Sequence, residues 1–461
     1  MDFDALLLSR LQFAFTIAFH ILFPAFTIGL ASYLAVLEGL WLVTKREAFR
    51  TLFLFWVKVF AVSFGMGVVS GVVLSYELGT NWSEFIRLAG GVVGPLLGYE
   101  VLTAFFLEAS FLGVMLFGWS RVGNRLHFLA TLLVALGTLM SAFWILAANS
   151  WMQTPQAFDV LADGRYQATD FVQVIFNPSF PARLLHMVLA AYLTTALCVG
   201  AASAYQLLKN RDQAESRLAL TMAVGMIAIT APLQLLAGHW SGEVVRTHQP
   251  SKLAAIEAYW ETGRNHPLNL VAIPDAKAET NHLQIAVPGL GVIVAPADQD
   301  VRGLKSFAPR DRPPVFPVFW GFRAMVGLGV LMIALGFWGA WQAWRRKLGQ
   351  DRWLLRFAVL MGPSGFAAVL CGWIVAEVGR QPWVVYGVLR TADAVSPVGA
   401  GQVSFSLLTY LILYAVVFSA GVIYILRMIG DGPVKLARET PDQAPRAPGS
   451  ALAAGPEEEA P

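Results

Sequence analysis

The stretch that decides the fold reads Gly-Trp-Ile-Val-Ala-Glu-Val-Gly-Arg-Gln-Pro-Trp and spans residues 372–383. Apolar residues run up to it from Leu354 with scarcely a polar break, so it lies at the end of a membrane-spanning helix. Pro382 ends that helix because proline lacks the backbone N–H donor. Glu377 sits inside the apolar environment, and Arg380 follows it. An ionisable group at membrane depth costs at least ~2.5 kcal/mol and marks a functional site, so the partner of Glu377 becomes the central question.

The composition indicates a membrane protein. Of 461 residues, 56% are hydrophobic and only 14% are charged, whereas about a quarter are charged in an average soluble domain. The net charge of +3 is small and spread along the chain, which argues against a nucleic-acid partner. Cys198 and Cys371 each lie inside an apolar run, so we expect packed thiols there. Asp2, Asp4 and the long apolar run after Arg10 argue against a cleavable signal peptide.

Long apolar runs define the fold class. Runs of about 20 residues are long enough to cross a bilayer as helices. Nine such runs lie near residues 12–43, 51–78, 92–118, 126–149, 182–208, 218–238, 318–344, 353–377 and 404–428. We therefore predict an all-α fold, a polytopic membrane helix bundle with about nine transmembrane helices.

Positive charge sets the expected orientation. Lys and Arg gather in alternate connections, at residues 44–50, 119–125, 209–217 and 345–352, and are sparser in the others. Because cytoplasmic loops carry the excess of Lys and Arg, we expect the N-terminus outside and the C-terminus inside.

The chain divides into four expected parts. Residues 1–238 hold the first six helices, and residues 318–430 hold the last three. Residues 239–317 form the one large connection, on the outer face, and mix a helical signal at 252–261 with segments rich in Gly and Pro. Residues 431–461 form a cytoplasmic tail rich in Pro, Ala and Glu, for which we expect disorder.

Polar residues inside the predicted spans point to chemistry within the membrane. The first span carries a polar stripe, and later spans carry isolated ionisable or sulfur-bearing groups: Gln12, Thr16, His20 and Thr27, then Glu100, Glu108, His186, Arg323, Met325 and Glu377. Two His, a Met and carboxylates on separate helices indicate metal or haem ligation inside a bundle. Buried carboxylates and hydroxyls, such as Glu100, Glu108, Ser110 and Ser141, suit proton transfer.

Each of these residues also has a plainer interpretation. A single intramembrane His can serve only as a hydrogen-bonding group between helices, and Met325 can simply pack. Glu100 or Glu108 can be protonated and structural. Arg323 lies two residues before Met325, so the two point to roughly opposite sides of a helix. Lys252 and Glu257 in the outer loop would ordinarily be solvated or snorkelling charges. The spacing alone therefore predicts a multi-helix membrane protein that handles electrons or protons.

Short motifs in a fixed order carry a family resemblance. They are Ser-Arg-Leu-Gln-Phe at 9–13 before His20, Gly-Thr-Asn-Trp at 79–82, Glu100 with Phe-Phe-Leu-Glu at 105–108, Trp-Ile-Leu-Ala-Ala-Asn at 144–149 with Trp-Met-Gln at 151–153, Lys-Leu-Ala-Ala-Ile-Glu-Ala at 252–258, Phe-Arg-Ala-Met-Val-Gly at 322–327, and Gly-Arg-Gln-Pro-Trp at 379–383. The sequence thereby resembles subunit I of cytochrome bd-type quinol oxidases, including the cyanide-insensitive oxidases. The 239–317 connection lacks the long insertion of some members, so the chain resembles the short-loop type.

The resemblance implies three haems. His186 and Met325 match the axial pair of a low-spin b haem, and Arg323 matches the arginine that supports it. His20 matches the ligand of a high-spin haem, and Glu377 matches the ligand of a second high-spin haem. Two haems would be b-type, and the third either d-type or again b-type.

The resemblance also implies roles in proton transfer and quinol oxidation. Glu100 lies near the other face of the His20 haem in the family, and Glu108 and Ser141 match groups on a proton route. Lys252 and Glu257 match quinol-site residues in the outer loop.

Together these expectations describe a terminal respiratory oxidase subunit of the bacterial cytoplasmic (inner) membrane. It would oxidise quinol, reduce oxygen to water and take protons from the cytoplasmic side, so generating a membrane potential. The expected partners are a second multi-helix subunit, subunit II, and small single-helix subunits. Arg380 is expected from its charge to pair with a haem propionate. From the residues alone, a di-haem electron-transfer subunit and a transporter stay open as alternatives.

Overall fold

A computed structural model describes residues 4–211 and 213–438. Within these residues nine helices are long and apolar enough to cross a membrane, which confirms the predicted helix bundle. A helix satisfies its own backbone hydrogen bonds, so long apolar segments in lipid fold this way. The spans are α1 (Ala5–Thr44), α2 (Glu47–Thr80), α3 (Ser83–Glu100) continued by α4 (Phe106–Phe117), α5 (Asn124–Gln153), α7 (Phe180–Leu208), α8 (Gln213–His248), α10 (Val315–Trp344), α11 (Arg352–Met361) with α12 (Ser364–Trp373), and α13 (Ala400–Asp431).

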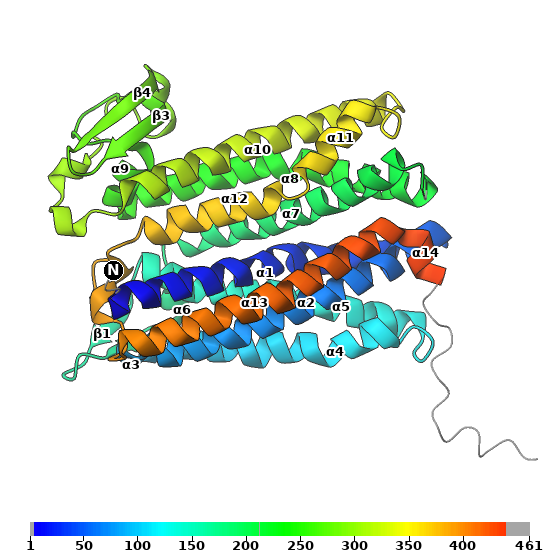
Figure 1. Cartoon of the computed structure of the whole chain (residues 1–461), viewed down its shortest axis with the longest axis horizontal. Coiled ribbons are helices and arrows are strands. Elements are labelled where there is room, and N and C mark those ends of the chain that lie inside the picture. The colour runs from blue at the N-terminus through cyan, green and yellow to red at the C-terminus, as the bar shows by residue number, and fades with distance from the viewer. Residues whose placement is uncertain (1–3, 212, 439–461) are drawn as a thin grey trace, which may run out of the picture.

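The helices run side by side and form two groups (Figure 1). One group holds α7, α8, α10, α11 and α12, and the other holds α1 to α5 and α13. Small residues let α1 and α7 approach closely across the boundary: a Cβ on Gly29 would lie 2.7 Å from the carbonyl oxygen of Ala191. This close approach leaves no room for a larger side chain at that position.

Two spans contain a π-helical turn instead of a continuous α-helix. The residues between α3 and α4 (Val101–Phe105) form one, and the residues after α12 (Ile374–Val378) form the other. The predicted 353–377 run is also broken between α11 and α12, where Pro363 is the N-cap of the new helix. Single π-turns are rare and are frequent at functional sites, and Glu377 lies in the second one.

Two short helices and three hairpins lie at the end of the bundle that we expect to face outward. The short helices are α6 (Phe171–Ile175) and α9 (Pro250–Glu257). Three antiparallel hairpins pair β1 (Phe158–Val160) with β2 (Tyr166–Ala168), β3 (Leu268–Asp275) with β4 (Thr280–Val287), and β5 (Trp383–Val385) with β6 (Leu389–Arg390). Figure 1 places β1, α9 and the β3–β4 hairpin at the same end of the bundle. The helix α8 continues to His248, so the compact outer segment starts later than the expected 239.

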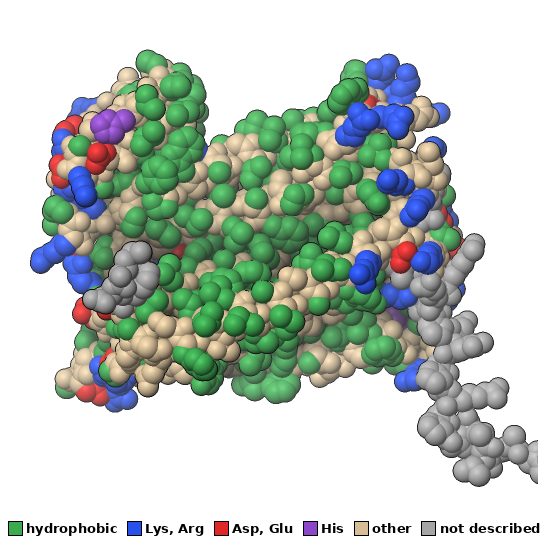
Figure 2. All heavy atoms as spheres, in the orientation of Figure 1, with side chains coloured by type: hydrophobic (Ala, Val, Ile, Leu, Met, Phe, Trp, Pro, Cys, Tyr) green, Lys and Arg blue, Asp and Glu red, His purple; other side chains and the backbone are tan. Residues whose placement is uncertain are grey.

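The surface separates apolar and charged side chains. In Figure 2 hydrophobic side chains cover the middle of the visible face, while charged side chains gather at the two ends. This distribution fits a slab of lipid around the middle of the helices. The predicted tail lies mostly outside the described residues. Its described start forms the short helix α14 (Pro433–Arg438), so the expectation of disorder is wrong for that part.

Candidate functional site

One large cavity brings the predicted site residues together. Its volume is about 1940 Å³, and it extends between both helix groups. Most residues singled out from the sequence for ligation, proton transfer or substrate binding line it: His20, Glu100, Glu108, Ser141, His186, Lys252, Glu257, Arg323, Met325, Glu377 and Arg380. Ser110 does not line the cavity and is exposed, so the expectation of a buried hydroxyl there is wrong. Its other lining residues are mostly apolar, as is usual for a site that holds a large organic group.

The two histidines and the methionine face glycines of neighbouring helices. His20 Nδ1 lies 2.9 Å from Ser70 Oγ on α2, and a Cβ on Gly71 would lie 3.2 Å from the imidazole. A Cβ on Gly238 would lie 3.3 Å from the imidazole of His186. A Cβ on Gly372 would lie 3.1 Å from Met325 Sδ. The missing side chains leave room for these three groups at the cavity.

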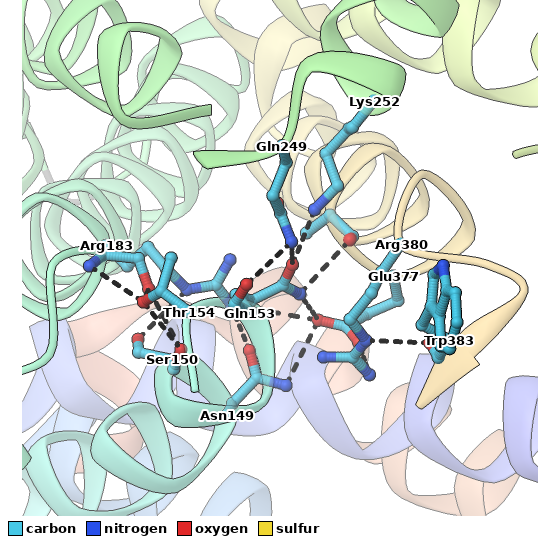
Figure 3. Close-up of polar contacts among 12 residues, drawn as sticks. Asn149, Ser150, Gln153, Thr154, Arg183, Gln249, Lys252, Glu377, Arg380 and Trp383 are labelled. Atoms are coloured by element: carbon cyan, nitrogen blue, oxygen red, sulfur yellow. Dashed lines mark hydrogen bonds and ion pairs between the residues drawn. The ribbon is translucent and has the colours of Figure 1, made fainter. Parts of the chain in front are cut away.

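Glu377 lies in a dense polar cluster (Figure 3). Arg380, three residues later, forms an ion pair with it at 2.5 Å. Asn149 and Gln153 from the end of α5 donate hydrogen bonds to Glu377 Oε1 at 3.2 Å and 3.1 Å. Arg183 from α7 lies 3.8 Å from the same oxygen. The partner of Glu377 in the described structure is therefore mainly Arg380.

Charge in this cluster is unbalanced. Arg183 and Arg380 accompany the single carboxylate of Glu377, and Lys252 is buried close by with an exposed fraction of 2%. Nη1 of Arg380 is buried and has no hydrogen-bond partner among the described residues. Since buried charges are normally paired, the surplus of positive charge fits an anionic group bound beside the cluster.

The side chains of Arg323 and Met325 contact different parts of the structure, as their spacing predicts. Arg323 Nη2 donates to Glu257 Oε2 at 2.6 Å, and its Nε donates to the carbonyl oxygen of Asn269 at 2.7 Å. The guanidinium therefore ties α10 to the outer segment, while Met325 is turned toward α12.

Lys252 and Glu257 are buried, so the plainer interpretation of both residues as solvated charges is wrong. Each has an exposed fraction of 2%. Burial lowers the pKa of Lys252 well below its usual value, and the nearby Arg183 lowers it further. Burial raises the pKa of Glu257, although Arg323 acts in the opposite direction. Both side chains thus sit in surroundings that disfavour their charged forms, which is frequent at functional sites.

Glu100 and Glu108 lie on either side of the first π-turn. Glu100 Oε1 accepts a hydrogen bond of 2.8 Å from Ser141 on α5. Glu108 is buried, and its Oε1 has no partner among the described residues. Gly137 packs directly against Glu108, since a Cβ on that glycine would lie 2.5 Å from Glu108 Cγ.

Sequence reasoning missed three polar residues at the cavity or beside it: Glu77 and Gln153, which are buried, and Arg183, whose side chain is 21% exposed. Glu77 accepts a hydrogen bond of 2.6 Å from Thr16, four residues before His20. Glu77 could have been predicted as a site residue, because it is a carboxylate inside the predicted 51–78 span. Arg183 stands three residues before His186, and Gln153 belongs to a quoted motif. Nothing in the local sequence pairs either of them with Glu377.

The donor groups are spread around the cavity. Among the described residues, no three His, Cys, Asp or Glu side chains gather closely enough to hold a bare metal ion. Imidazole, thioether and carboxylate groups on separate helices, with a large apolar space between them, instead fit a metal carried by an organic macrocycle.

Comparisons with known proteins agree with this arrangement. The sequence profile of the family described as "Cytochrome bd terminal oxidase subunit I" matches residues 8–433. The chain is 37% identical to "Cytochrome bd ubiquinol oxidase subunit 1" of Bacillus subtilis (strain 168), over 93% of this chain and 94% of that protein. It is 34% identical to "Cytochrome bd-II ubiquinol oxidase subunit 1" of Escherichia coli (strain K12), over 95% and 99%.

A solved structure has the same fold. The bd oxidase from Geobacillus thermodenitrificans superposes with a TM-score of 0.86 at 29% sequence identity, covering 93% of this chain and 99% of that chain. Matches that span nearly the whole length leave one conclusion, which confirms the resemblance: the chain belongs to the cytochrome bd terminal oxidase subunit I family.

Proposed function

We propose that this chain is the haem- and quinol-binding subunit of a terminal oxidase that oxidises quinol and reduces oxygen to water. Membership of the family supports a quinol:oxygen oxidoreductase. The observation that carries the finer proposal is that His20, His186, Met325 and Glu377 line one cavity of about 1940 Å³. The same cavity reaches Lys252 and Glu257 near the outer segment.

The residues present fit haem. His186 and Met325 would hold a low-spin b haem. His20 and Glu377 would each hold a high-spin haem. One of these two high-spin haems would be b-type, and the other d-type or again b-type. The surplus of positive charge around Glu377 and the buried Nη1 of Arg380 suit the carboxylates that a porphyrin carries. Bound there, the haems would supply electron transfer and the reduction of oxygen.

Residues of the outer segment would bind and deprotonate the quinol. Lys252 can donate a hydrogen bond to a quinol oxygen, because its side-chain nitrogen carries N–H donors. Glu257 can accept the proton that leaves the quinol, since its raised pKa brings it closer to neutral pH. Arg323, at 2.6 Å, holds the Glu257 carboxylate in place.

Glu108 and Glu100 would move protons toward the buried site. Both line the cavity, and Ser141 orients Glu100 through its hydrogen bond. With quinol oxidised at the outer face and these protons drawn from the cytoplasmic side, turnover would generate a membrane potential without a separate pump.

The remaining expectations belong to the same proposal. The chain would have its N-terminus outside and its C-terminus inside the bacterial inner membrane. It would assemble with a second multi-helix subunit, and the family allows small single-helix subunits. The relatives' printed names, which describe subunit 1 of an oxidase, support the partner.

Quinol-driven oxygen uptake by the purified complex tests this function. We expect uptake with a short-chain ubiquinol, and Lys252→Ala should lower kcat/KM about tenfold or more, the value of one charge-assisted hydrogen bond. Haem content should stay unchanged in this variant.

Lys305→Ala is the matched control, because Lys305 is an exposed lysine of the same segment that pairs with Glu261. It should behave like the wild type. A complex without oxygen uptake, or an equal loss of haem in Lys252→Ala, would contradict the proposal.

A further inference from the structure

Gln153, the last residue of α5, joins two parts of the site that come from distant segments (Figure 3). Its Oε1 accepts a hydrogen bond of 2.6 Å from Lys252 Nζ on α9. Its Nε2 donates to Glu377 Oε1 at 3.1 Å and to the carbonyl oxygen of Ala376 at 3.3 Å. The side chain is buried, with an exposed fraction of 2%. One amide therefore lies between the outer-segment lysine and the membrane carboxylate.

The chemistry of the partners fixes which way this amide points. An amide nitrogen can only donate, so Gln249 Nε2 requires the oxygen of Gln153, which Lys252 Nζ also contacts. A backbone carbonyl can only accept, so Ala376 requires the nitrogen. A flipped amide would lose both contacts at once. An apolar side chain of similar size would satisfy neither partner.

Other contacts hold Gln153 and Lys252 in this place. Gln249 Nε2 donates to the backbone oxygen of Gln153 at 2.9 Å and to its Oε1 at 3.0 Å. The stem of Lys252 lies along Gly379, where a Cβ would come within 3.0 Å of Lys252 Cγ. The lysine thus reaches Gln153 along the same backbone turn that follows Glu377, and Gln153 is positioned from both sides.

We propose that Gln153 is a positioning residue that holds Lys252 and Glu377 at a fixed separation, and so couples the geometry of the quinol site to that of the buried carboxylate. This inference rests on the function proposed above. It assigns Gln153 no contact with substrate. Its loss should therefore disturb quinol binding through Lys252 and, separately, the surroundings of Glu377.

Two variants of the purified complex separate these effects. Gln153→Leu should raise the KM for a short-chain ubiquinol about tenfold, as expected for the loss of one charge-assisted hydrogen bond, with a smaller change in kcat. It should also shift the absorption bands of the dithionite-reduced complex, because Glu377 loses a donor. Lys252→Met should raise KM similarly and leave the bands in place, since Gln153 still contacts Glu377.

The double variant tests the coupling directly. If Gln153 acts on quinol through Lys252, the KM of the double variant should stay within about twofold of the larger single effect, because contacting residues do not contribute additively. Gln156→Leu is the matched control. This glutamine lies three residues later and donates to the backbone of Gln173, outside the cluster. It should leave KM and bands as in the wild type.

Several outcomes would overturn the inference. They are additive effects on KM, unshifted bands in Gln153→Leu, or equal changes in Gln156→Leu. Gln153→Asn, which keeps the amide but is too short to reach both partners, provides a milder variant that should show the same two signals. Failure of both Gln153 variants to assemble would make the residue purely structural. A wild-type complex without haem or quinol oxidation would instead refute the proposed function, and this is decided before any variant is made.

Discussion

Arg323 and Glu257 form an ion pair, with 2.6 Å between Nη2 and Oε2, that fastens α10 to the outer segment. The carboxylate is buried, and burial raises its pKa more strongly than the guanidinium lowers it. A carboxylate whose pKa lies closer to neutral pH can both accept a proton and release it again. The pair thus gives Glu257 a fixed position and a tuned proton affinity.

The pH dependence of quinol oxidation should report this carboxylate. Only the deprotonated form of Glu257 accepts a proton, so kcat/KM should fall as pH decreases through its pKa. Because burial raises that pKa, the fall should lie above the usual Glu value of about 4.3. Arg323→Gln removes the group that lowers the pKa, so the fall should move to higher pH. Glu257→Gln should not show this fall of kcat/KM at low pH. The same fall in that variant would contradict the assignment to Glu257.

Replacing Glu377 should separate an oxidase from a simple electron carrier. Glu377→Gln keeps the size of the side chain but removes the charge that Arg380 and Arg183 face. We expect oxygen uptake to fall at least tenfold, with altered absorption bands. Breaking a buried ion pair costs about 3–5 kcal/mol, so the complex should also unfold at lower temperature.

Glu84→Gln is the control for this change. Glu84 pairs with Arg87 at the same three-residue spacing, but both side chains are partly exposed. An exposed pair is worth about 0–1 kcal/mol, so this variant should keep its activity and stability. Unaltered oxygen uptake in Glu377→Gln would favour a di-haem electron-transfer subunit, which has no need of an open-site carboxylate.

The position of Glu108 can be tested without changing its charge. Gly137→Ala places a Cβ only 2.5 Å from Glu108 Cγ, so the Glu108 side chain must move. If Glu108 passes protons, kcat should fall about tenfold while the KM for quinol stays constant, since small misplacements at a reacting group are costly. Gly113→Ala on α4 meets no atom within 4 Å and should have no effect. Equal kcat values for the two variants would argue against a role for Glu108.

The sequence alone predicts the helix bundle because the length of an apolar run directly reflects the thickness of a bilayer. The pairing of Glu377 with Arg380 was not predicted, because Arg380 was expected from its charge to pair with a haem propionate. The π-turns and the break at Pro363 were not predicted, because they change the backbone path without interrupting the apolar composition.

Contacts between distant segments set the limit of sequence reasoning at the site. Gln153 and Arg183 reach Glu377 only because α5 and α7 place them beside the π-turn that follows α12, and no local pattern encodes that. From the sequence alone Lys252 is interpreted as a solvated charge, because its burial depends on how α9 folds back over the membrane helices. The haem, proton and quinol roles of individual residues stay proposals.

We propose that porphyrins occupy the cavity between His20, His186, Met325 and Glu377. A reduced-minus-oxidised absorption spectrum of the purified complex, together with pyridine haemochrome analysis, detects them. We expect strong Soret absorbance, three haems per chain, and loss of the low-spin signal in His186→Ala. A folded, purified complex without Soret absorbance would contradict this proposal.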